Sequence, residues 1–563
     1  MAAVRNILLL LAPAQVLLCQ LTPEQRVFDF QQLVSVFAKN YAPYEWKRDV
    51  LKFDLYDVSP WLEKARQARD DIEFWEICAA YAASLRDSHA GVSFPSAFAA
   101  TIGITADLYD ERVLIESVTR SSLPADKFPF GRGDEIVSVD GQPVQAWIAE
   151  AVRLIGDANE RAARRWAVSY LFNRPQSVFP AAGRLADFLR LGVRLASGET
   201  REFEIPWTKR GYALPGAGLT PNPVAGLRAS APRLLGGETA FYEEFLARLD
   251  RKSASSGDRV VGNGARNPYY SMPPDFVLRL GRRTADFHYS GVYEAGGKRI
   301  GFLRIPNFRP SSTASAIAEL EIEIAYLNEN TDGLVVDISR NPGGSCYGLE
   351  ALRRLIPAPF QLPADEIRAT LATAYEAELA LIDARNRRAD AETIARLEQI
   401  FYEVRNALAE DRGRTKPLPF CGSTVEQKPA TDSTGRLLAY SGPLVLVVDE
   451  FTASWGDIFA AVIRDSGRGR LIGMPTNGAG GSFSTAPAGF FSEMTASFTT
   501  TLSVRQRAVE MEGGGETRYL ENVGVHPDYY YDYMTRKNLE EGGREFVTAF
   551  TWAILEEIAR VRP

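Results

Sequence analysis

A serine and three histidines are the residues of this sequence best suited to nucleophilic chemistry. The 563-residue chain contains only His89, His288 and His526, so a reaction that needs an imidazole near neutral pH has three candidates. Ser454 lies in the run LVLVVDEFTASWGDIF, where a buried strand is followed by a tight turn and a helix. The free amides and dipole at the start of that helix would favour a negative charge developing on a reacting oxygen.

The same serine also has a purely structural interpretation. Ser454 and Asp457 have the spacing of a capping box, in which the serine hydroxyl accepts a hydrogen bond from the first helical turn. Position alone favours this capping role over catalysis.

A glycine pair marks a second strand end. In LVVDISRNPGGS, a buried strand runs into Gly343 and Gly344, whose missing side chains let backbone amides approach a ligand closely.

The elements that must position these residues form several regions. At one to two hundred residues per domain, the length predicts about three or four domains. Residues 21–97 have mostly helical spacing, and the predicted helix over 71–85 places His89 just past its C-terminal end.

Residues 98–210 change to short strands with turn signals. The run GRGDEIVSVDGQPV resembles the turn, strand and Asp-Gly hairpin of PDZ domains. That resemblance implies that Ile102, Gly103 and Ile104 form the edge where a peptide adds as an extra strand. Another small barrel with a Gly-Asp turn is the alternative.

Residues 296–358 and 441–563 alternate strands with helices, which predicts a mixed or parallel βαβ sheet. The charged, alanine- and leucine-rich stretch at 363–412 predicts a helical insertion within 359–440, and the region 211–295 is interpreted as a linker or insertion. The predicted fold class is multidomain α/β.

Together, these segments resemble the tail-specific (C-terminal processing) serine peptidases and their tricorn-core and chlamydial relatives. The similarity lies in the order of a PDZ-like segment, an Asn-Pro-Gly-Gly strand end and the serine turn. It implies a ClpP/crotonase-like peptidase core with Ser454 as nucleophile. The Trp455 amide and an amide of Gly343 or Gly344 would bind the oxyanion.

This sequence departs from the family pattern at the position of the catalytic base. Where the bacterial tail-specific branch has a catalytic lysine, this sequence has Ala479, and the only lysine after Ser454 is Lys537. The segment LRDSHAGVSF resembles the histidine motif of the chlamydial and tricorn-core branch, which implies that His89 is the base. His288 and His526 are interpreted as structural.

The third member of a triad follows from the resemblance of ENVGVHPD to a motif of the same relatives. It implies that Glu521 orients the histidine and stabilises its charged form. An exposed turn carboxylate is the alternative.

Composition and the N-terminal sequence limit the kinds of partner, cofactor and anchor that we expect for this protein. The net charge of −7 argues against a dedicated nucleic-acid binder, and no motif suggests a metal or another cofactor. Residues 1–20 resemble a secretory signal peptide, and Leu18 before Cys19 argues against a lipid anchor. The remaining cysteines, Cys78, Cys346 and Cys421, could form at most one bridge, whose pairing is not readable.

These observations predict a periplasmic or extracellular serine endopeptidase that acts on peptides or proteins, with no stable membrane anchor. The alternative is a non-catalytic ligand- or peptide-binding protein on the same fold. A further hypothesis is that the helices of 363–412 cover the cleft or form a homodimer.

Overall fold

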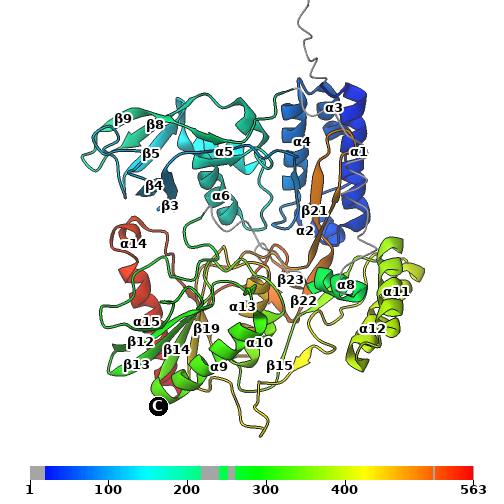
Figure 1. Ribbon diagram of the computed structural model, residues 1–563, viewed down its shortest axis with the longest axis vertical. Helices are drawn as coiled ribbons and strands as arrows, with labels where there is room; N and C mark the ends of the chain where they lie inside the picture. The colour runs from blue at the N-terminus through cyan, green and yellow to red at the C-terminus, as the bar shows by residue number, and fades with distance from the viewer. Residues whose placement is uncertain (1–19, 217–239, 251–259, 512–513, 562–563) are drawn as a thin grey trace, which may run out of the picture.

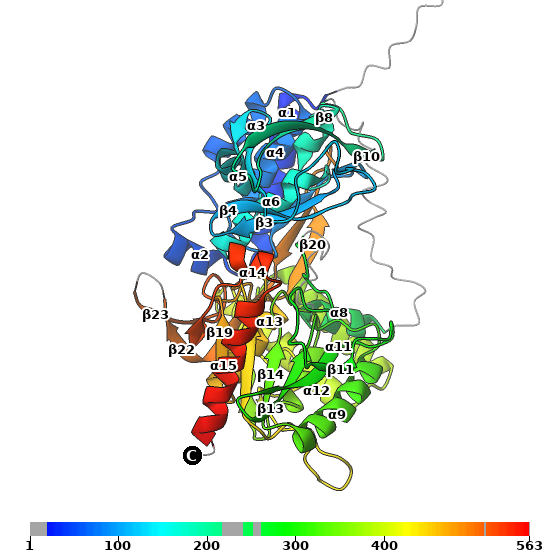
Figure 2. The same ribbon diagram turned by 90° about the vertical axis from the view of Figure 1, so that its left-hand side faces the viewer.

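The computed structural model describes residues 20–216, 240–250, 260–511 and 514–561. The N-terminal helices and a β-rich module lie at one end of the molecule, and a larger α/β core lies at the other (Figures 1 and 2). Residues 1–19 of the predicted signal peptide and residues 217–239 and 251–259 of the predicted linker lie outside the described residues. The predicted multidomain α/β fold class is confirmed.

The N-terminal region is helical, as its spacing predicts. Its first helix has a full capping box between Thr22 and Gln25, and its fourth is capped by Asp70, which accepts from the Glu73 amide at 2.9 Å. The helices are α1 (Pro23–Asn40), α2 (Tyr44–Leu51), α3 (Ser59–Gln67) and α4 (Asp71–Ala83).

The β-rich module is an antiparallel sheet in the order β3-β4-β5-β8-β9, with β6 beside β5. Two helices and the sheet share one apolar core, and β3 is an edge strand. The elements are β3 (Ile104–Tyr109), β4 (Arg112–Val118), β5 (Glu135–Val139), β6 (Gln142–Pro143), β8 (Phe188–Arg194), β9 (Thr200–Pro206), α5 (Val144–Val152) and α6 (Glu160–Phe172). A small sheet of β10 (Thr208–Arg210), β2 (Ala99–Thr101) and β7 (Asn173–Pro175) and the short 3₁₀ helix at Pro180–Arg184 adjoin it.

The core is a seven-stranded mixed sheet in the order β11-β12-β13-β14-β18-β19-β24. Strands β13 to β24 are parallel, whereas β11, β12 and β13 are antiparallel. The strands are β11 (Val277–Leu280), β12 (Tyr289–Ala295), β13 (Lys298–Arg304), β14 (Gly333–Asp337), β18 (Leu444–Val448), β19 (Arg470–Gly473) and β24 (Tyr529–Tyr530).

Helices cover both faces of this sheet. Because side chains alternate along a strand, Leu334 and Val336 pack toward one face and Val335 toward the other. The first face is covered by α9 (Thr313–Asn330), α10 (Tyr347–Arg353) and α13 (Trp455–Asp465), and the second by α15 (Arg544–Val561), with α14 (Arg536–Glu540) beside it. Burial on both faces explains why β14 and β18 are continuously apolar.

The core sheet starts earlier than the sequence analysis predicts. Strands β11 and β12 lie within 211–295, the stretch interpreted as linker, and the same stretch contains α8 (Phe241–Asp250). A turn at Gly296 and Gly297, both with positive φ, joins β12 to β13 as a hairpin. This glycine pair is the signal that the sequence analysis missed.

The predicted insertion 359–440 contains two helices, α11 (Leu371–Asn386) and α12 (Ala391–Ala409), which pack with α8. It is not wholly helical, since it also contains β15 (Phe360–Gln361), β16 (Ala364–Ile367) and β17 (Glu426–Gln427). Strand β16 pairs with β22 (Thr501–Glu510), which pairs in turn with β23 (Glu516–Tyr519). A Cys346–Cys421 disulfide joins the start of α10 to this region, and Cys78 is a free, buried thiol.

One hairpin of the C-terminal half reaches into the N-terminal region. Strands β20 (Phe483–Pro487) and β21 (Thr495–Thr499) rise beside the N-terminal helices (Figures 1 and 2). Strand β21 pairs antiparallel with β1 (Gly91–Ser93), and Ala496 and Phe498 enter the apolar core of the helical region. This pairing fixes the segment just after His89 against the C-terminal half.

Candidate active site

Ser454 lies at the carboxyl end of β18, directly before α13. It is fully buried and has a left-handed backbone with φ of 60°. Its amide donates to the Asp457 carboxylate at 2.8 Å, but its hydroxyl has no hydrogen-bond partner among the described residues. The capping function is thus carried out by the backbone and Asp457, and the serine Oγ remains available for chemistry.

Asp457 connects the serine turn to the loop after β19. Its carboxylate also accepts from the Thr476 hydroxyl at 2.5 Å and from the amides of Gly478 and Ala479 at 2.8 and 3.1 Å. Burial raises the pKa of Asp457 to about 6, although these hydrogen bonds act in the opposite direction. The carboxylate therefore holds two segments of the site together.

The glycine pair lies against Ser454 because β14 and β18 are parallel neighbours whose carboxyl ends share one edge. A Cβ on Gly343 would lie 2.7 Å from Ser454 Cβ and 2.9 Å from the Trp455 nitrogen. The Gly343 amide donates to Asn341 Oδ1 at 2.8 Å. Among the hydrogen bonds found within the described residues, none is donated by the amides of Gly344 or Trp455, so these two amides are available to donate to a ligand.

His89 is nearly fully buried, and it is held both by the nearby residue Asp87 and by Phe483 of β20. Its amide donates to Asp87 Oδ1 at 2.8 Å, and its ring stacks on Phe483 with 5.6 Å between ring centroids. Asp87 in turn accepts from the hydroxyls of Tyr41 and Thr499 at 2.8 and 2.7 Å. Burial raises the pKa of Asp87, but Lys47 and His89 outweigh it, so the net pKa is lowered and the carboxylate stays charged.

Glu521 is fully buried, so the exposed-turn alternative is wrong. One carboxylate oxygen accepts from Lys47 Nζ at 2.5 Å, and the other has no hydrogen-bond partner among the described residues. Burial, together with the negative charge of Asp87, raises the pKa of Glu521 to about 8 against the influence of Lys47.

A cavity of about 430 Å³ is lined by His89 but not by Ser454 or Glu521. His89 lines it together with Ala453, which precedes the serine, and Ala479, which lies beside Asp457. Much of the remaining wall is apolar, including residues of α4, the β-rich module and β20. No described residue of 359–440 lines the cavity, so the insertion gives it no cover in this structure.

The polar residues of this cavity that are absent from the sequence predictions include Asn263 and Asp157. Asn263 is buried, and neither polar atom of its carboxamide has a hydrogen-bond partner among the described residues. Asp157 accepts from Asn477 Nδ2 at 3.0 Å, and burial raises its pKa to about 7. Neither residue lies in a recognisable motif, and only the folded chain brings them to the cavity.

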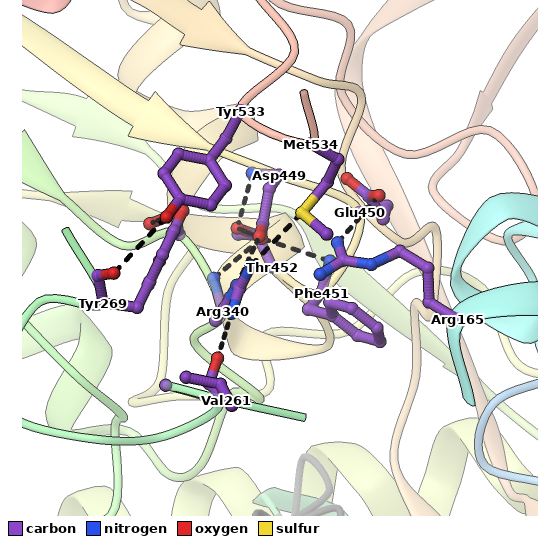
Figure 3. A network of polar contacts seen from close by, with 12 residues as sticks. Arg165, Val261, Tyr269, Arg340, Asp449, Glu450, Phe451, Thr452, Tyr533 and Met534 are labelled. Carbon is purple, nitrogen blue, oxygen red and sulfur yellow. Dashed lines mark hydrogen bonds and ion pairs between the residues drawn. The ribbon is translucent and has the colours of Figure 1, made fainter. Parts of the chain in front are cut away.

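A buried polar network supports the two strand ends that carry Ser454 and the glycine pair (Figure 3). The Arg340 amide donates to Asp449 at 2.7 Å, and its guanidinium donates to the Val261 carbonyl and lies 3.7 Å from the ring centroid of Tyr269. Arg165, from α6 of the β-rich module, donates to Glu450 at 2.9 Å. The β-rich module is thereby tied to the turn that carries Ser454.

The three residues predicted to bind a peptide in the PDZ-like module do not line the cavity. Ile102 and Ile104 are buried, and their amides donate to the carbonyls of Phe172 and Ile102. Gly103 accepts from the Thr119 amide at 2.7 Å. Ile104 is the first residue of the edge strand β3. The strand edge to which a peptide could add therefore starts at Ile104 and does not include Ile102.

Neither of the other histidines lines the cavity. His288 is buried between Glu319 and the Tyr347 hydroxyl, at 2.8 and 2.6 Å from its two ring nitrogens. His526 contacts the Tyr530 hydroxyl at 2.6 Å.

Comparison with known families agrees with this geometry. Residues 299–531 match the sequence model of peptidase family S41, and residues 99–215 match that of a PDZ domain. Residues 299–531 form a serine-type peptidase domain of family S41. The predicted resemblance and the predicted enzyme class, a serine protease with a PDZ domain, are confirmed.

Known relatives cover nearly the whole chain. A protein of Chlamydia trachomatis serovar D is 26% identical over 89% of this chain and 87% of its own length, and one of Chlamydia pneumoniae is 24% identical over 96% and 91%. The crystal structure of mature CPAF superposes with a TM-score of 0.73 at 21% identity, covering 96% of this chain and 99% of that one. CPAF complexed with lactacystin gives a TM-score of 0.72 at 22% identity. These structures share the fold of this chain.

Within the described residues, no helix combines the length and apolar character needed to cross a membrane.

Proposed function

We propose that this S41 peptidase is an exported endopeptidase that cleaves peptide bonds through an acyl-enzyme, with Ser454, His89 and Glu521 as its catalytic triad. The observation that carries the proposal is the unbonded hydroxyl of Ser454, which a strained turn holds beside a cavity lined by His89. A hydroxyl without a structural partner in a buried turn is the arrangement that a nucleophile requires.

In the proposed reaction, His89 takes the hydroxyl proton as Ser454 Oγ attacks the carbonyl carbon of the scissile bond. The amides of Trp455 and Gly344 bind the negative oxygen of the tetrahedral intermediate. His89 then gives the proton to the leaving amine, and the C–N bond breaks to leave an acyl-enzyme. A water molecule, deprotonated by His89, hydrolyses the ester and restores the serine.

Glu521 would stabilise the imidazolium that forms twice in this cycle. Its burial makes a nearby carboxylate charge effective, since little solvent screens it. Export is supported by the Cys346–Cys421 disulfide, because such bonds persist in oxidising compartments.

Labelling with a fluorophosphonate probe and hydrolysis of casein test the proposal. Wild-type protein should be labelled at Ser454, and Ser454→Ala and His89→Ala should lose both labelling and hydrolysis, by about 10³-fold or more. Glu521→Gln should reduce hydrolysis strongly.

His526→Ala is the matched control, since His526 does not line the cavity. It should retain labelling and activity. Folded wild-type protein that neither reacts with the probe nor hydrolyses casein would favour a binding function on the same fold, and full activity in His89→Ala would reject the triad.

A further inference from the structure

Lys47 of helix α2 is a buried cation that the sequence analysis does not assign to the site. Its side chain is fully inaccessible to solvent. Its ammonium group donates three hydrogen bonds, to Glu521 Oε1 and Asn522 Oδ1 at 2.5 Å each and to the Arg86 carbonyl at 2.9 Å. A lysine is rarely buried to this extent unless it is paired, and here every ammonium proton has an acceptor.

These contacts join the two chain segments that carry the proposed acid and base. Arg86 lies three residues before His89, and Asn522 follows Glu521. The Asn522 side-chain amide also donates to the Arg86 carbonyl, at 2.8 Å. Lys47 therefore lies where the base segment and the acid segment meet.

Helix α2 holds Glu521 at its main chain as well. The indole of Trp46 donates to the Glu521 carbonyl at 3.0 Å, while Lys47 binds the carboxylate of the same residue. The position of Glu521 is thus fixed from two adjacent residues of one helix, and only one of its carboxylate oxygens is occupied.

The charges around Glu521 make Lys47 the group that favours its ionised form. Facing it are Lys47 from α2, Asp87 from the segment after α4, Asp457 from α13, and the phenol of Tyr41 at the end of α1. Burial and the two aspartates raise the pKa of Glu521, whereas Lys47 lowers it. Without the ammonium group, the pKa of Glu521 would be raised further.

We propose that Lys47 is a positioning residue of the active site, whose ammonium group orients the Glu521 carboxyl group and favours its charged form so that Glu521 can stabilise the imidazolium of His89. This inference rests on the proposed Ser454–His89–Glu521 triad. Lys47 does not touch the reacting atoms and acts only through Glu521.

The pH profile of casein hydrolysis tests the proposal. Activity that requires ionised Glu521 is lost as the pH falls through the pKa of that group. Removing an adjacent positive charge raises this pKa, so Lys47→Met should lower kcat and move the acid limb upward by about 1 to 3 pH units. Lys47→Arg, which keeps the charge, should bring the limb back toward its wild-type position.

Arg26→Met is the matched control. Arg26 forms another buried ion pair in the same helical region, with Asp71 at 3.0 Å, but it does not contact the proposed triad. Its loss should lower stability and leave the acid limb in place. If Lys47→Met fails to fold, Lys47→Gln provides the same measurement with a neutral side chain that can still donate hydrogen bonds.

Parallel measurement of Glu521→Gln separates this inference from the proposed function. If Glu521→Gln loses activity while folded Lys47→Met or Lys47→Gln keeps the wild-type acid limb, the role of Lys47 is rejected and the triad stands. If Glu521→Gln is fully active, both proposals are rejected.

Discussion

Ser454 holds a backbone conformation that residues with a Cβ rarely adopt, with φ of 60° and ψ of −117°. Such strain costs on the order of 1–3 kcal/mol and persists only where neighbouring groups enforce it. Here the Asp457 carboxylate holds the Ser454 amide, and the Ala453 amide donates to the Asn341 carbonyl at 3.0 Å. The turn therefore presents the hydroxyl at a defined place instead of using it as a helix cap.

Replacement of Gly343 by alanine should impair the chemistry. The new Cβ would lie 2.7 Å from Ser454 Cβ and 2.8 Å from the Ala453 carbonyl oxygen, so the nucleophile or the oxyanion site must shift. Displacement of one oxyanion donor costs about 10²- to 10³-fold in kcat, and we expect a loss of that order in casein hydrolysis.

Gly141→Ala provides the control for the backbone effect alone. Gly141 has a similar φ of 82°, but a Cβ there would meet no heavy atom within 4 Å. It should lose a little stability and keep kcat. Equal activities of the two alanine variants would contradict the close packing of Gly343 against Ser454.

At the scale of elements, the pairing of β1 with β21 ties the segment just after His89 to the C-terminal half. Gly91 is aligned with Ser497, and the Thr499 hydroxyl at the end of β21 donates to Asp87. The ring of His89 also stacks on Phe483 at the start of β20. A C-terminal hairpin thus fixes the position of His89, the proposed base.

The disulfide is a second connection between elements, and its removal should lower stability. Cys346 and Cys421 are separated by 75 positions, and Phe420 beside the bridge packs edge-on against Trp455 at 5.3 Å between ring centroids. Closing a loop of this length stabilises a fold by about 3–5 kcal/mol. The double variant Cys346→Ser/Cys421→Ser should therefore unfold at lower urea concentration.

Reduction offers a direct check of the same bond. Dithiothreitol should lower the urea midpoint of wild-type protein toward that of the double variant and leave the variant unchanged. A wild-type midpoint insensitive to reductant would show that the bridge is not formed in solution.

At the scale of the whole molecule, the PDZ domain and the peptidase core share buried charges. Arg165 of α6 binds Glu450 of the serine turn at 2.9 Å (Figure 3). It also binds Asp107 of β3 at 2.6 Å. Burial raises the pKa of Glu450, but Arg165 and Arg161 outweigh it and lower the pKa to about 2. The turn before Ser454 therefore depends on a cation from another domain.

Arg165→Met should leave buried carboxylates without their main partner, at a cost of about 3–5 kcal/mol. We expect a lower urea midpoint and a reduced kcat, because Glu450 lies four residues before Ser454. Arg66→Met, which removes an exposed ion pair with Glu63, should change stability by about 1 kcal/mol or less. Equal midpoints for the two variants would contradict this coupling.

The sequence by itself determined the local features of this protein. Apolar runs predict β14 and β18 because strands buried on both faces need apolar residues at every position, and helical spacing predicts α4 and α9. The scarcity of histidine and the absence of the family's lysine limited the choice of base. The family itself was readable from the glycine pair and the serine turn.

Only the tertiary structure decided how these residues interact. The lysine that binds Glu521 has no local signal, because its partner lies far away in the chain. Lys47 and Glu521 are 474 positions apart, and nothing in either segment specifies the other. Their pairing follows from burial, since two charges removed from water are stable only when the fold brings them together.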